Sequence, residues 1–195
     1  MTEAEWLTCD DPRTLGEVAL RRKRRTARVL RLILTAIWSW HADRLHSKKD
    51  RAEMREALEV LQNWADAGVE PPNSIDVDYV FFLADPRMAF RTTLAMPRGT
   101  ENASLDEAAR AVWALREVIG NPFRPVAFDA AWRTDTVLSL ARHMYESRDF
   151  SAMPILADAL QDAGCDHDDI LNHCRDANGV HVRGCWVVDL VLGKE

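Results

Sequence analysis

The residues of this chain that are best suited to site chemistry crowd into residues 165–185. Three of the four cysteines and three of the six histidines lie there, namely Cys165, Cys174, Cys185, His167, His173 and His181. Thiolates and imidazoles are preferred ligands of zinc, which four of them usually surround tetrahedrally at about 2.0–2.3 Å. The segment is therefore the candidate zinc site of the chain.

Helical spacing reduces this set of candidate ligands. In a straight helix over residues 166–175, Cys165 would lie about 12 Å along the axis from His173, too far to share an ion with it. The metal-ligand set that remains is His173, Cys174, His181 and Cys185. In this set, His181 and Cys185 are expected about one helical turn apart, after a turn over residues 175–180.

A structural interpretation of the same residues competes with zinc. The sequence has no CxxC pair, and a fourth ligand requires the adjacent His173 and Cys174 both to face the ion. Cysteine is among the most often buried residue types, so Cys174 and Cys185 can equally be small core residues, with the histidines at helix ends. The sequence favours this interpretation and no cofactor, with zinc as the alternative.

A basic run is the second feature with a possible binding role. Residues 1–51 hold 12 Lys/Arg against 7 Asp/Glu, whereas residues 52–195 hold 13 against 24. The candidate contacts to nucleic acid or to an acidic partner are Arg21, Arg22, Lys23, Arg24, Arg25 and Arg28. Because no aromatic residues interleave the run to stack on bases, a solvated helix start that pairs with the acidic remainder of the chain is favoured.

Motifs of catalysis are absent from the sequence. It has no nucleophile elbow, phosphate-binding glycine loop, dinucleotide fingerprint or HExxH pair. Ser139 and His143 are four residues apart on an expected helix, but no third group orients them, so they are expected on an exposed face. The acids around Asp168 lack the glycine and distal glutamate of a calcium loop. The sequence therefore leans toward a protein that is not an enzyme.

Apolar periodicity predicts an all-α fold, a single compact bundle of about seven or eight helices. One domain over residues 1–195 is expected, with possible subdivisions at 1–70 and 101–195. Residues 71–103 have no clear pattern, and 77–83 fit either a strand or a helical turn. The predicted helices cover residues 26–45, 47–68, 104–118, 137–145, 151–163, 166–175 and 183–192, the last of them central to a core.

Seven tryptophans mark possible core or recognition positions. Those on apolar helix faces are expected in the core: Trp38, Trp64, Trp113 and Trp186. Trp6 and Trp40 are expected to be partly exposed, where a tryptophan can anchor a partner.

Nothing in the sequence predicts a membrane protein or a secreted one. The N-terminus carries Glu3 and Glu5 instead of an apolar signal core. The most apolar stretch, residues 29–40, is shorter than the roughly 20 residues that a membrane span needs. A cytoplasmic protein with reduced thiols is expected.

Five segments of the chain carry a resemblance to known proteins: MTEAEWLTCDDP at the start, NPFRP from Asn121, LADAL from Leu156, AGC from Ala163 and HVRGCW from His181. They resemble a large family of bacterial paralogues, found chiefly in planctomycetes, to which no activity is assigned. The resemblance covers about the first dozen residues and the last third of the chain, and it implies no activity. Together these features predict a non-enzymatic cytoplasmic module that binds another protein. Nucleic-acid binding and zinc binding are the alternatives.

Overall fold

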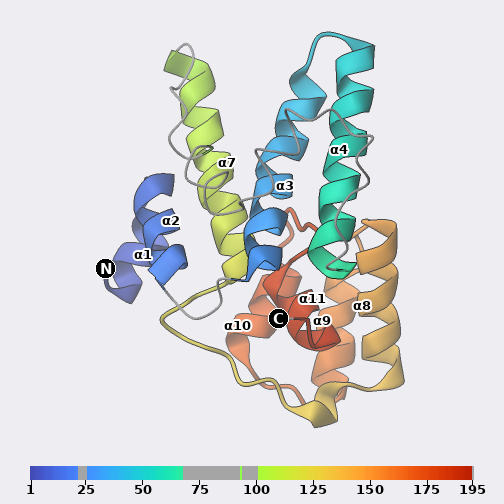
Figure 1. The fold of residues 1–195 in the computed structure, drawn as a ribbon. Coiled ribbons are helices and arrows are strands. Elements are labelled where there is room, and N and C mark those ends of the chain that lie inside the picture. The colour runs from blue at the N-terminus through green and yellow to red at the C-terminus, as the bar shows by residue number, and fades with distance from the viewer. Residues whose placement is uncertain (22–25, 68–92, 94–100, 195) are drawn as a thin grey trace. The chain divides into compact units, whose positions relative to one another are not determined.

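The computed structural model describes residues 1–21, 26–67, 93 and 101–194 (Figure 1). The described residues form nine α-helices and one short 3-10 helix, with no strand among them. The predicted all-α fold is thereby confirmed. The expectation for residues 77–83 lies outside the described residues. None of the described helices is both long enough and apolar enough to span a membrane.

The chain divides into two compact units, Met1–Arg124 and Pro125–Glu195. This boundary differs from the expected subdivision between residues 70 and 101. The reason is that α7 (Glu101–Ile119) packs against α2 (Pro12–Arg21) and α3 (Ala27–Arg44), and so belongs to the first unit. The expectation of one domain over residues 1–195 stays a prediction.

The first unit begins with two short helices, α1 (Glu3–Thr8) and α2. Thr2 and Glu5 form a capping box that starts α1, in which each side chain accepts a hydrogen bond from the other residue's backbone N–H. Trp6 is only 1% exposed, so the expectation that it is partly exposed is wrong. It packs beside the Phe123 ring, and Arg116 Nη2 donates a 2.8 Å hydrogen bond to its carbonyl oxygen.

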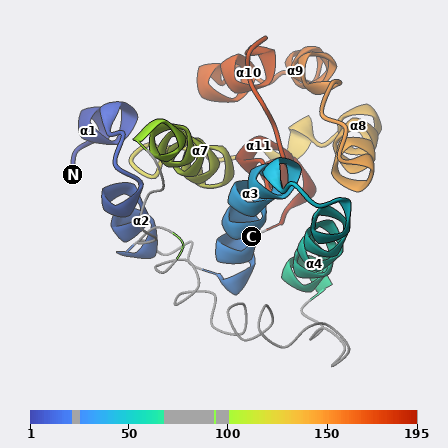
Figure 2. The same ribbon diagram turned by 90° about the horizontal axis from the view of Figure 1, so that it is seen from above.

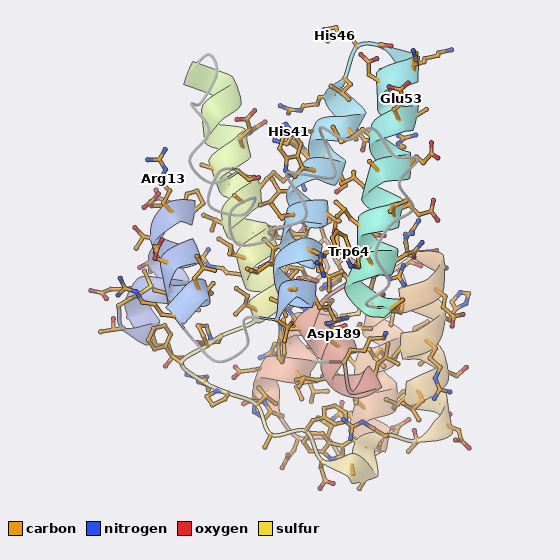
Figure 3. The ribbon with its side chains drawn as sticks, viewed as in Figure 1. Arg13, His41, His46, Glu53, Trp64 and Asp189 are labelled. Carbon is orange, nitrogen blue, oxygen red and sulfur yellow. The ribbon has the colours of Figure 1, made fainter. Side chains whose placement is uncertain are left out.

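A long helical hairpin forms another part of the first unit's described core. The predicted helices at 26–45 and 47–68 are confirmed as α3 and α4 (Lys48–Ala67), which run in opposite directions side by side (Figure 1). Trp64 on α4 is buried and lies between the two helices (Figure 3). The Arg31 guanidinium of α3 stacks over its ring at 3.7 Å. Trp40 is half-buried, as expected, with Arg44 3.7 Å over its ring.

The second unit contains four α-helices around one apolar core. These are α8 (Asp135–Ser147), α9 (Met153–Asp162), α10 (Asp168–Arg175) and α11 (Trp186–Leu192), and a 3-10 turn, η1 (Ala130–Trp132), precedes them. Seen from above, α8, α9 and α10 follow one another in an arc around α11 (Figure 2). The fully buried side chains that they contribute include Val137, Met144, Leu156, Leu160, Ile170 and Val187.

The last helix confirms one expectation and corrects another. Val187, Val188 and Val191 are fully buried, so this segment is central to the core of the second unit, as predicted. However, α11 begins at Trp186 instead of residue 183, because Gly184 has φ +99°, outside the range of a right-handed helix. The residues just before Trp186 therefore form a turn.

Candidate metal centre

The packing of helix α10 determines which of its two candidate ligands, His173 or Cys174, can bind a metal ion. Its apolar face carries Ile170, Leu171 and Cys174, which are all buried in the core of the second unit. Adjacent residues on an α-helix point about 100° apart, so His173 cannot share the direction of Cys174. His173 is half-buried and lies at the edge of this face, close to the segment that precedes α11.

Two turns bring His181 and Cys185 back to α10. The first closes after the helix end, where the Gly179 N–H donates to the Asp176 carbonyl at 2.9 Å. The second closes where the Cys185 N–H donates to the Val182 carbonyl at 2.8 Å, with Gly184 in its left-handed conformation. His181 lies between the two turns, and Cys185 immediately precedes α11.

The three side chains converge on one point within the second unit. His173 Nε2 lies 3.2 Å from Cys185 Sγ. The imidazole rings of His173 and His181 meet edge to face with centroids 4.8 Å apart. One potential ligand atom from each of His173, His181 and Cys185 lies within 4.8 Å of the other two.

These separations suit a shared ion. Two ligand atoms bound tetrahedrally at about 2.0–2.3 Å lie about 3.3–3.8 Å apart. The contact between His173 and Cys185 is already close to that range, and side-chain movements of about 1 Å bring the widest separation into it. The indole of Trp186 lies 5.1 Å from the His173 ring, centroid to centroid, and is tilted 52° to it.

Two other cysteines lie away from this cluster. Cys174 was a candidate ligand, but it is fully buried in the apolar core and is not among the converging ligand atoms. Cys165 is also outside the cluster, as the helical spacing predicted, and burial raises the pKa of its thiol. All four cysteines are thiols, with no disulfide between them.

The structure brings His173, His181 and Cys185 together without Cys174, the other predicted ligand, and it does so in a different way from the one expected. His181 and Cys185 were expected one helical turn apart, but both precede α11 and are joined by the turn at Gly184. The turn predicted over residues 175–180 is present, but sequence reasoning did not identify Gly179, which lies close to His181 in that turn. The Asn178–Gly179 pair is a common turn signal and pointed to this bend.

The basic run is only partly described. Arg21 is exposed at the end of α2, and residues 22–25 lie outside the described residues. The Arg28 Nε donates a 3.1 Å hydrogen bond to an Asp66 carboxylate oxygen, and both side chains are only 11% exposed. Arg31, one turn further along α3, is buried over Trp64. Arg28 and Arg31 therefore make contacts within the α3–α4 hairpin and do not form part of a solvent-facing basic surface.

The other side chains considered for site chemistry are exposed or lie at a helix start. Ser139 and His143 are exposed on α8, as expected. Asp168 and Asp169 lie in the first turn of α10, where acidic side chains favour a helix start.

The chain matches no known family model, and neither the curated proteins nor the solved structures contain a protein that matches it. The resemblance to the bacterial paralogue family stays a prediction.

Proposed function

We propose that this protein binds a zinc-type divalent metal ion through His173, His181 and Cys185 of its C-terminal unit. The observation that carries the proposal is the convergence of one potential ligand atom from each of these residues within 4.8 Å. These residues are three of the four ligands that a tetrahedral ion takes. The ion would connect the end of α10 to the segment that leads into α11.

The chemistry of the three side chains selects the class of metal. One thiolate sulfur and two imidazole nitrogens suit zinc and related soft or borderline ions. Magnesium and calcium take oxygen ligands, so this set does not suit them. Copper binds such ligands more tightly than zinc in the general order of affinities, so the ligand set alone does not distinguish these two metals.

Burial supports a structural role for the ion in place of a catalytic one. Cys185 is fully buried and both histidines are half-buried, so the ligand atoms lie inside the protein. Catalytic zinc keeps a position open for water or substrate, whereas structural zinc is enclosed and contributes directly to folding. This role agrees with the expectation that the protein is not an enzyme. Binding of a partner protein stays a prediction.

The test is zinc binding by the purified full-length protein in competition with a chromophoric chelator. We expect one tightly bound zinc per chain in the wild type and a large loss of affinity in Cys185→Ser. Two matched controls remove thiols outside the cluster, Cys165→Ser and Cys174→Ala, and both should retain the metal. Failure of the wild type to bind zinc, or equal affinity in Cys185→Ser, would overturn the proposal.

A further inference from the structure

Gly179 lies where a side chain would collide with a proposed metal ligand. A Cβ atom built at this position would lie 2.9 Å from Nε2 and 3.2 Å from Cε1 of His181. It would also lie 3.0 Å from the Asp176 carbonyl oxygen. Separations below 3.0 Å are essentially never adopted by Cβ atoms, so any residue other than glycine forces a neighbour to move.

Space, and not backbone conformation, accounts for glycine at this position. Gly164 and Gly193 have φ values of +91° and +66°, with nothing within 4 Å of a Cβ atom. Glycine suits those two positions because other residues adopt positive φ at a cost. Gly179 does not have a positive φ, yet it alone of the three has close neighbours.

Of these neighbours, the His181 imidazole is the one that would move. The Asp176 carbonyl is fixed by the turn, because it accepts the Gly179 N–H at 2.9 Å, and the Asp176 side chain accepts the Asn178 N–H at 3.0 Å. The His181 ring is held by side-chain torsions, which change at less cost than a hydrogen-bonded turn. A methyl group at 179 would therefore push the ring out of its present position beside His173.

We infer that Gly179 is a positioning residue for metal binding, because its missing side chain lets the His181 imidazole lie against the turn and face His173 and Cys185. This inference rests on the proposed function. It predicts that a single methyl group, added without removing any ligand, weakens metal binding. Changes to groups that orient metal ligands cost about 10- to 100-fold in affinity, and we expect a loss in that range for Gly179→Ala.

The experiment measures zinc affinity of the full-length wild type, Gly179→Ala and Gly164→Ala by chelator competition, with the melting temperature of each metal-free protein. Gly164→Ala strains the backbone but adds its methyl group to open space. It should lower the melting temperature and leave zinc affinity unchanged. Gly179→Ala should instead weaken zinc affinity and leave the melting temperature of the metal-free protein unchanged. Cobalt(II) in place of zinc adds a readout of ligand geometry, and its visible spectrum should change in Gly179→Ala alone.

A double-mutant comparison keeps the inference testable if Gly179→Ala also destabilises the fold. If Gly179 acts through His181, adding Gly179→Ala to His181→Ala should cause no further loss of zinc affinity. An equal loss in both backgrounds would contradict the inference. Wild-type affinity and an unchanged cobalt spectrum in Gly179→Ala would also overturn it, while the proposed metal site would stand. Absence of zinc binding by the wild type would instead refute the proposed function itself.

Discussion

The first unit is built on helices of 18 and 20 residues, α3 and α4, whereas the second closes on helices of 8 and 7 residues, α10 and α11. Isolated helices shorter than about 12–15 residues are marginal in water, so α10 and α11 depend on what packs against them and connects them. The long pair has large buried side chains along its contact, including Leu58, Leu61 and Trp64. The short pair is joined by a ten-residue connection, 176–185, that carries two of the three proposed ligands.

The difference suggests two ways of stabilising helices. In the first unit, an arginine and a tryptophan stack inside a hairpin that the sequence pattern already defines. In the second, a metal ion would act as a cross-link between a helix end and a loop. Each of the following changes acts on one unit, and its effect on the other unit tests the comparison.

The largest effect is expected from truncating the chain before Gly184. The truncation removes Cys185 and the fully buried Val187, Val188 and Val191. Loss of one large buried side chain costs about 2–5 kcal/mol, against the roughly 5–15 kcal/mol that stabilises a domain. We expect the second unit to lose its cooperative unfolding, as followed by hydrogen exchange of α8 and α9, while α3 and α4 stay protected. Cooperative melting near the wild-type temperature would show that α11 is dispensable.

Trp64→Ala should produce the corresponding loss in the first unit. Its indole is 8% exposed, and removing a buried aromatic side chain costs about 3–5 kcal/mol. Urea unfolding followed by hydrogen exchange of α3 and α4 measures this cost, and α8 to α11 should be unaffected.

Arg31→Met tests the stacking contact between the Arg31 guanidinium and the Trp64 ring. Burial lowers the pKa of Arg31, and its Nε has no hydrogen-bond partner among the described residues. Because desolvation of the guanidinium offsets its attraction to the ring, an apolar side chain of similar length should not reduce the free energy of unfolding. A loss of more than about 2 kcal/mol would show that the cation itself stabilises the hairpin.

Zinc should stabilise only the second unit. A ligand that binds the folded state alone adds about 2.7 kcal/mol when its free concentration is 100 times Kd. Excess zinc should therefore raise the melting temperature of the second unit by several degrees, as measured by calorimetry with and without the metal. The transition of the first unit should stay in place. Equal shifts in both transitions, or none, would contradict a metal cross-link confined to α10 and α11.

The parts of the structure that the sequence predicted well are those governed by helical periodicity. The predicted ends of α3 and α4 agree with the structure within a residue or two, because long amphipathic patterns average over many positions. Trp6 was misjudged because its burial depends on Phe123 and Arg116, more than 100 residues away. Local pattern contains no information about such contacts.

The candidate site was predictable in composition but not in geometry. Cysteine and histidine crowding identified the segment, and helical spacing excluded Cys165. The choice between His173 and Cys174 depended on which side of α10 meets the core, and that is a property of tertiary packing. The turn over residues 175–180 was predicted, but the turn at Gly184 and the close approach of Gly179 to His181 were not, because they depend on backbone conformation and on tertiary packing.

A small effect is expected from pH on the first unit. Burial lowers the pKa of His41, and the nearby Arg44 adds to this, while Glu107 at 4.0 Å opposes it. The unfolded chain, with an ordinary pKa of about 6.5, therefore takes up a proton before the folded chain does. This contribution to stability is present above about pH 6.5 and is lost as the pH falls toward the lowered pKa. His41→Gln should flatten that dependence in urea unfolding of α3 and α4 between pH 7.5 and 5.5, and an unchanged slope would contradict it.

X-ray absorption spectroscopy of the zinc-loaded full-length protein tests the central claim most directly, because it counts the atoms bound to the ion. The proposed site predicts one sulfur at about 2.3 Å and at least two imidazole nitrogens at about 2.0–2.1 Å. The sulfur should disappear in Cys185→Ser and remain in Cys174→Ala. A shell of oxygen alone, or a sulfur that survives in Cys185→Ser, would contradict the assignment of His173, His181 and Cys185 as the metal ligands.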